Sequence, residues 1–290
     1  MHDGDLSIAP ALAKIYKALK KWETQPDRRE AFTLKLLDHL RATVREQSLH
    51  EDSIEAALCD WFECGLFGGF RLSEWAQNAS EWNPSAPQLD IFDDTKAFCL
   101  DDLTFEKAAR KRISAVAAAN DPDPGTIVKC WIRFRTQKNG QNHEERFFVR
   151  NTTTGGHCFI TAALNIIRRF IRVRGHDDRI TPLALYTSTT SNGETRLITS
   201  KQIEDNMQMC AAAVHGITND ADLQFWSAHS LRVGACELLH SRGFTGTQIK
   251  WTLRWRSDSF MVYLRNNFVL STAQNRIFDE ASSSPPYALL

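Results

Sequence analysis

The stretch "SAHSLRVGACELLHSRGFTGTQIKWTLRWRSDSFMVYLRN" (residues 227–266) has the apolar spacing of packed helices, interrupted by side chains that are costly to bury alone. His229 and Arg232 are three residues apart, so on a helix they share a face. Gly243 is expected to end that helix, and a Thr-x-x-Gln capping box beginning at Thr245 is expected to start the next one. The pattern therefore predicts two consecutive helices that gather an imidazole, guanidinium groups, an indole and a phenol.

Length and composition are those of a globular protein with a core of its own. The chain has 290 residues, of which 42% are hydrophobic and 10% aromatic. No apolar run approaches the roughly 18 residues that span a bilayer, and the first residues lack the pattern of a signal peptide. Seven scattered cysteines without a Cys-x-x-Cys pair are typical of reduced thiols, so we expect an intracellular protein without a structural zinc site or a membrane partner.

Charge is distributed unevenly along the chain. Residues 1–100 carry 11 Lys and Arg against 17 Asp and Glu, whereas residues 101–290 carry 24 against 18. The formal net charge of zero thus hides an acidic first third and a basic remainder, which contains the opening stretch. This asymmetry is compatible with a phosphate-binding face in the basic part.

The rest of the chain predicts a mainly helical fold with one small antiparallel sheet, an α+β class. The segment 51–70 is apolar nearly all round and is expected to be a central, buried helix, after which three glycines allow a short helix to begin at Arg71. Two strands are expected to pair through the Asn139-Gly140 turn. The further helices are expected at 8–22, 27–47, 104–120, 157–175 and 200–217, and the strands at 96–105, 126–137 and 144–151.

Three other groups of residues leave alternatives open. The basic run at 110–112 is either a phosphate contact, a nuclear signal or a solvated helix face, of which we favour the last. The arginines of "IIRRFIRVR" (166–174) are equally compatible with a DNA-facing stripe and with an ordinary polar face. His157 and Cys158 are adjacent and lack obvious partners, which favours core or helix-cap roles over a metal or nucleophile role.

The joint pattern of the opening stretch resembles the tyrosine recombinase (phage integrase) family, and is closest to recombinases of eukaryotic mobile elements. "AHSLRVGA" (228–235) is similar to the His-x-x-Arg box of that family, and "GFTGTQIKWTLRWRSDSFMVYLRN" (243–266) to its closing segment, which ends in the nucleophilic tyrosine. Trp255 follows Arg232 by 23 residues, and Tyr263 follows Trp255 by eight. "GLFGGFRLSEW" (65–75) resembles the box that holds the first catalytic arginine and its neighbouring acid.

The resemblance implies a site for cleaving and rejoining duplex DNA, without a cofactor or a metal. Two arginines would clamp the phosphodiester oxygens, the histidine and indole would add hydrogen bonds, and the tyrosine would attack to form a 3′-phosphotyrosine. A lysine on the hairpin turn would protonate the departing 5′ oxygen, and Lys129 on the preceding strand is the alternative to it. The implied catalytic residues are Arg71, Lys138, His229, Arg232, Trp255 and Tyr263, with Glu74 orienting one of them.

The resemblance also implies a domain organisation and partners. Residues 1–26 would be a linker or the last helix of a largely missing core-binding domain, 27–270 the catalytic domain, and 271–290 a tail that packs on a neighbouring subunit. The implied partners are double-stranded DNA and further copies of the chain, in the nucleus if the host is eukaryotic. Two alternatives remain: an inactive or domesticated DNA-binding derivative, and an activity like that of type IB topoisomerases.

Overall fold

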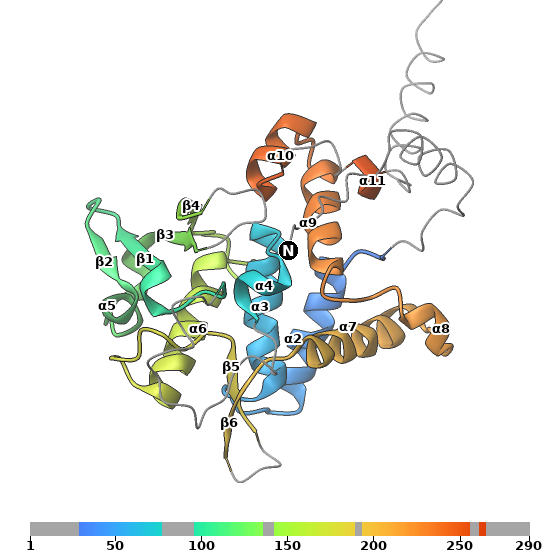
Figure 1. Ribbon diagram of the computed structural model, residues 1–290, viewed down its shortest axis with the longest axis horizontal. Coiled ribbons are helices and arrows are strands. Elements are labelled where there is room, and N and C mark those ends of the chain that lie inside the picture. The colour runs from blue at the N-terminus through green and yellow to red at the C-terminus, as the bar shows by residue number, and fades with distance from the viewer. Residues whose placement is uncertain (1–28, 77–95, 136–141, 189–192, 256–260, 265–290) are drawn as a thin grey trace, which may run out of the picture.

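A computed structural model describes residues 29–76, 96–135, 142–188, 193–255 and 261–264 of the chain. Helices form about half of this part, and the central one, α3, lies between the larger sheet and a group of further helices (Figure 1). The described helices are α2 (Leu34–Glu46), α3 (Ile54–Gly68), α4 (Leu72–Trp75), α5 (Ala115–Ala119), α6 (Phe159–Arg174), α7 (Ser200–His215), α8 (Asp220–Leu223), α9 (Ser230–Ser241), α10 (Gly246–Leu253) and α11 (Met261–Leu264).

The strands form two antiparallel sheets. The larger has the order β2-β1-β3-β4, and the smaller pairs β5 with β6. Their bounds are β1 (Leu103–Lys107), β2 (Arg112–Ser114), β3 (Ile127–Phe134), β4 (Glu144–Val149), β5 (Leu185–Thr187) and β6 (Thr195–Leu197). Alternate residues of β3 are buried, so one face of the larger sheet packs on the core. The observed class is therefore mainly α with small antiparallel sheets, as the sequence predicted.

α3 is the centre of the hydrophobic core, as its apolar composition predicted. All but three of its fifteen residues are buried, and the Ser53 side chain caps it by accepting a hydrogen bond from the N–H of Ala56 at 3.2 Å. The helix continues through Gly65 and ends only at Gly69, whose φ of 55° lies in the left-handed region that glycine adopts without strain. The chain then turns directly into α4, with Arg71 as its first flanking residue.

Several predicted elements are confirmed. The strands β3 and β4 pair antiparallel, α6 runs to a cap at Gly175, and α7 occupies the segment expected for it. α9 ends two residues before Gly243, and α10 begins at Gly246 with Thr245 as its N-cap residue in the predicted capping box. Cys158 is the N-cap residue of α6, in agreement with the helix-cap interpretation.

Other predictions were wrong. The segment 104–120 is not one helix: it forms β1, β2 and only the short α5, because pairing with β3 buries Phe105 completely. The expected strand at 96–105 begins only at Leu103, after a 3₁₀ turn. The helix expected from residue 27 begins at Leu34, since the N–H groups of Glu30 and Phe32 donate hydrogen bonds to the carbonyl oxygens of Phe225 and of Ser230, the first residue of α9. The loop after α6 contains the unpredicted β5–β6 hairpin.

The proposals for residues 1–26 and 271–290 fall outside the described residues, as does Lys138. Each of the seven cysteines lies within the described ranges, is buried and has no disulfide partner there. Among the helices that the structure describes, none combines the length and the apolar character that crossing a membrane requires.

Candidate functional site

Arg71 lies where the chain leaves α3 and enters α4. Its backbone is extended, and its N–H donates a hydrogen bond to Glu74 Oε2 at 2.9 Å. Its guanidinium Nη1 donates to the other oxygen, Oε1, at 2.8 Å. The side chain of Arg71 is 25% exposed, whereas that of Glu74 is 3% exposed. Glu74 therefore holds Arg71 through both of its carboxylate oxygens while leaving its guanidinium accessible.

Glu74 is also paired with Arg254, a residue that the sequence did not single out. Arg254 Nη1 lies 3.1 Å from Oε1 and Nη2 lies 3.0 Å from Oε2, so the two side chains form a bidentate pair. Both residues are almost fully buried, at 3% and 2% exposure. Burial alone would raise the pKa of Glu74, but the charge and hydrogen bonds of Arg254, then those of Arg71, lower that pKa below its usual value.

The backbone and surroundings of Arg254 are unusual as well. It caps α10 with a φ of 58°, a left-handed conformation that costs most residues about 1 kcal/mol or more. Its guanidinium carbon lies 3.6 Å from the ring centroid of Phe134 at the end of β3, and Nη2 is 3.4 Å from the Gly68 carbonyl oxygen. Arg254 thus joins α10, the sheet and the C-terminal end of α3.

Arg232 lies in the first turn of α9 and is directed toward the same end of α3. It is 5% exposed and donates a hydrogen bond to the carbonyl oxygen of Gly69. Its guanidinium carbon lies 5.0 Å from the ring centroid of Trp255, the residue after Arg254. The last carbonyl groups of a helix carry partial negative charge, so the end of α3 stabilises both buried arginines.

His229 is the N-cap residue of α9 and is exposed at the surface. Desolvation by the surrounding chain, followed by the positive charges of Arg232, Arg29 and Arg71, lowers the pKa of His229 to about 4. Because an exposed imidazole keeps much of its hydration, we attribute the lowered pKa of His229 mainly to the neighbouring arginines. The ring is therefore neutral at pH 7, and its unprotonated nitrogen can accept a hydrogen bond.

The predicted set is thus brought together in part. Arg71, Glu74, His229, Arg232 and Trp255 meet around the C-terminal end of α3. Tyr263 belongs to α11, whose Leu264 packs on α9 and α10 with Ala235, Cys236, Ile249 and Leu253, but the structure does not describe the tyrosine side chain. Lys138 lies in the undescribed segment 136–141.

Lys129, the alternative lysine, lies on the outer face of the sheet. Its Nζ is 2.9 Å from Glu106 Oε1 on β1 and 5.7 Å from the ring centroid of Phe147 on β4. Phe134, which contacts Arg254, is five residues further along β3 and is buried on the opposite face. Within the described part of the chain, Lys129 therefore points away from the face that borders the site.

The arginines of 166–174 do not form an exposed stripe. Arg169 is buried in an ion pair with Asp60 at 2.7 Å, Arg172 pairs with Asp52 at 2.6 Å, and Arg174 pairs with Asp178 at 2.9 Å. In the described ranges, no group of three or more His, Cys, Asp and Glu side chains is arranged to hold a metal ion.

Comparisons with known proteins gave structural matches only. No protein-family model matches the chain, and no curated protein matches it. Among solved structures, the chain is similar to the Tn1549 transposon integrase in complex with transposon right-end DNA, with 12% identity, a TM-score of 0.42, and coverage of 89% of this chain and 68% of that one. A second structure of that integrase, in complex with circular-intermediate DNA, has 11% identity, a TM-score of 0.35, and coverage of 92% and 76%.

Proposed function

We propose that this chain is the catalytic domain of a tyrosine recombinase of a mobile element, which cleaves duplex DNA and rejoins it through a covalent 3′-phosphotyrosine. The observation that carries the proposal is the meeting of Arg71, His229, Arg232 and Trp255, from three separate segments, at one end of α3. These are the residues that the family resemblance requires at one phosphodiester.

The arginines supply the electrostatic part of the reaction. The transition state of phosphodiester cleavage carries more negative charge than the ground state, so fixed cations aimed at the nonbridging oxygens lower the barrier. Arg71 is held by Glu74 and remains accessible, and Arg232 is fixed on the Gly69 carbonyl. Because both are anchored before DNA binds, little reorganisation is needed when the phosphate arrives.

The proposed cleavage and rejoining steps require neither a metal ion nor ATP. The Tyr263 hydroxyl loses its proton to neutral His229, the oxygen forms a bond to phosphorus, and the bond from phosphorus to the 5′ oxygen breaks. Lys138 protonates that 5′ oxygen as it leaves. The reverse steps rejoin the strand, since the phosphotyrosine preserves the phosphodiester linkage. The outward orientation of Lys129 favours Lys138 in this role.

The test is covalent trapping on a nicked duplex that loses its cleaved end. Wild-type protein should form a protein–DNA adduct that survives denaturant, and Tyr263→Phe should abolish the adduct, a loss of at least about a hundredfold, while leaving DNA binding in place. Tyr186→Phe is the matched control, because among the described residues the Tyr186 hydroxyl accepts a hydrogen bond from Gln202 on α7, outside the candidate site. An adduct that persists in Tyr263→Phe would refute the role of Tyr263.

The same assay separates the alternatives. DNA binding by wild-type protein without any adduct would identify an inactive DNA-binding derivative. Relaxation of supercoiled plasmid without strand exchange between two duplexes would identify a topoisomerase-like activity. The proposal includes assembly of several copies on DNA, which is measured by the mass of the complex with a duplex substrate.

A further inference from the structure

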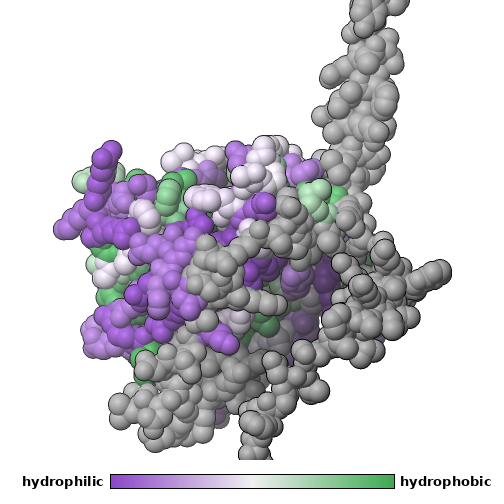
Figure 2. Space-filling model, turned by 45° about the horizontal axis from the view of Figure 1, so that its top comes forward, coloured by the Kyte–Doolittle hydropathy of each residue, from purple (hydrophilic) through white to green (hydrophobic). Residues whose placement is uncertain are grey.

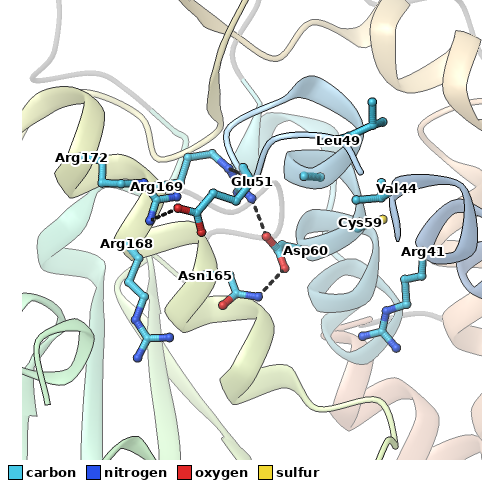
Figure 3. A pocket seen from close by; sticks show the side chains of 11 residues that line it. Arg41, Val44, Leu49, Glu51, Cys59, Asp60, Asn165, Arg168, Arg169 and Arg172 are labelled. Carbon is cyan, nitrogen blue, oxygen red and sulfur yellow. Dashed lines mark hydrogen bonds and ion pairs between the residues drawn. The ribbon is translucent and has the colours of Figure 1, made fainter. Parts of the chain in front are cut away.

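A second concentration of arginines surrounds a cavity away from the proposed catalytic site. The cavity has a volume of about 370 Å³ and is recessed between the end of α2, the first half of α3 and the second half of α6 (Figure 3). Four arginines line it, together with the acids Glu51 and Asp60. The arginines are Arg41, Arg168, Arg169 and Arg172.

This cavity and the proposed catalytic site lie at opposite ends of α3. Ala56 lines the cavity, whereas Gly68 and Gly69 hold Arg254 and Arg232. Twelve residues of α-helix separate Ala56 from Gly68, a rise of about 18 Å. A phosphate bound at the catalytic site therefore cannot also contact the cavity.

Four carboxylates around the cavity engage three of the arginines, because Glu51 and Asp52 both pair with Arg172. Asp60 pairs with Arg169 and also accepts a hydrogen bond from Asn165 at 3.0 Å. Arg172 pairs with Asp52. The third pair joins Arg41 to Glu63. The carboxylates next to the cavity are therefore already engaged.

Arg168 is the arginine of the cavity that takes part in none of these ion pairs. Its Nε donates to the carbonyl oxygen of Ala119 at 3.1 Å, and no carboxylate of the described residues pairs with its guanidinium group. Figure 3 shows this side chain among the groups that line the cavity, next to Asn165. Its positive charge is thus available to a ligand in the cavity.

Arg169 adds a second, independent observation. Its side chain is 4% exposed, and its Nη1 is buried without a hydrogen-bond partner in the described part of the chain. A buried guanidinium with an unmade hydrogen bond is costly, and a nearby anion lowers the electrostatic part of that cost. Two adjacent residues of α6 therefore both favour negative charge in the cavity.

We propose that this cavity binds a small phosphate-bearing anion, with Arg168 as its principal cation. Its volume is in the range of small-ligand sites, about 300–1,000 Å³, and its position between three helices suits a compact ligand better than a duplex. The planar guanidinium fork matches phosphate oxygens. The ligand would tie α2 and α6 to α3 and so stabilise the helix on which the catalytic arginines depend.

Inorganic pyrophosphate is the probe that tests this site, in full-length protein without DNA. Calorimetric titration at constant ionic strength should show one saturable site, and Arg168→Gln should weaken binding about tenfold, the loss of one charge-assisted contact. Arg168→Lys keeps the charge but not the planar guanidinium fork, so its affinity for pyrophosphate should lie between those of wild-type protein and Arg168→Gln. Arg45→Gln is the matched control, because Arg45 is exposed on the same α2 helix that bears Arg41 and does not line the cavity.

Three outcomes would overturn the proposal: no saturable binding by wild-type protein, equal binding by Arg168→Gln, or an equal loss in Arg45→Gln. Circular dichroism of each variant confirms that it is folded. A short duplex should not compete with pyrophosphate, and stoichiometric displacement by the duplex would assign the phosphate to the DNA backbone instead. The readout does not depend on DNA cleavage, so failure of the recombinase proposal would leave it unaffected.

Discussion

Each carboxylate oxygen of Glu74 is shared between two arginines. Arg71 contacts them through its backbone N–H and its guanidinium, and Arg254 through a bidentate fork. The accessible arginine of the site is thus fixed by a carboxylate that is itself fixed by a buried arginine. A single acid between two cations orients Arg71 without covering it.

Removing the Arg254 guanidinium should destabilise the fold strongly. Arg254→Gln leaves Glu74 buried with one cation fewer, which we expect to lower the free energy of unfolding by about 3–5 kcal/mol. Arg254→Gly removes the same group, but glycine adopts the left-handed backbone conformation without strain. The decrease in the free energy of unfolding should therefore be smaller than in Arg254→Gln by about 1 kcal/mol. Urea unfolding followed by tryptophan fluorescence measures both.

Arg179→Gln provides the comparison for these variants. Arg179 forms an ion pair with Asp101 at 3.0 Å in which both side chains are about half exposed, and such pairs contribute about 0–1 kcal/mol. If Arg254→Gln unfolded at the same urea concentration as Arg179→Gln, the buried pair would not be holding the site together.

The sequence pattern singled out several residues of the candidate site but not the arginine that supports them. His229, Arg232 and Trp255 were singled out because their spacing along the chain resembles that of the tyrosine recombinase family. Arg254 was not, because its partner lies 180 residues away and the left-handed backbone that directs its side chain depends on the end of α10. Tertiary pairs of this kind leave no local pattern.

The C-terminal end of α3 holds arginines from several helices in the candidate site. Gly68 and Gly69 offer carbonyl oxygens to Arg254 and Arg232, and Arg71 follows two residues later. Gly69 is required there because its φ is positive and because an added Cβ would lie 2.6 Å from Leu253. The helix end therefore positions three arginines from three elements.

The segment 104–120 shows where local propensity fails. Alanine, lysine, glutamate and arginine favour a helix, and the sequence analysis predicted one. In the structure Phe105 on β1 pairs with Cys130 on β3 and with Ile113 on β2, so sheet formation, rather than a helix, packs these apolar residues. Burial against distant strands outweighs a propensity difference of about 0.5 kcal/mol per residue.

α9 packs unusually close to the extended segment before α2. Phe32 N–H donates to the Ser230 carbonyl oxygen at 3.0 Å, and a Cβ at Gly234 would lie 2.0 Å from the carbonyl oxygen of Phe32. Gly234→Ala should force these segments apart and lower the free energy of unfolding by about 1–3 kcal/mol, measured by urea unfolding. Because α9 carries His229 and Arg232, adduct formation should decrease as well.

Gly125→Ala is the control for this effect. Gly125 lies in an exposed turn with no positive φ, and an added Cβ would meet only the Asp123 side chain, at 3.2 Å. We expect a change within about 0.5 kcal/mol. Equal stability of Gly234→Ala and wild-type protein would show that the close approach of Phe32 and α9 does not contribute.

On the scale of the whole molecule, the described surface near the site is polar. In Figure 2 hydrophilic residues gather on the left, the side of the larger sheet, and apolar residues form smaller patches. The basic excess of residues 101–290 lies in residues 101–200, which carry 16 Lys and Arg against 10 Asp and Glu, whereas residues 201–290, which supply α9 and α10, carry eight of each. Such a surface suits a charged, hydrated partner better than an apolar one.

The salt dependence of DNA binding tests this surface as a whole. If the site contacts backbone phosphates, the logarithm of the binding constant should fall linearly with the logarithm of the salt concentration, with a slope of about −0.9 per phosphate contact. Arg71→Gln removes one accessible cation and should reduce the magnitude of that slope by about 1. Arg45→Gln, on the exposed end of α2, should leave it unchanged. Fluorescence anisotropy with a labelled duplex at several salt concentrations gives all three slopes, and identical slopes for wild-type protein and Arg71→Gln would show that Arg71 does not contact a DNA phosphate.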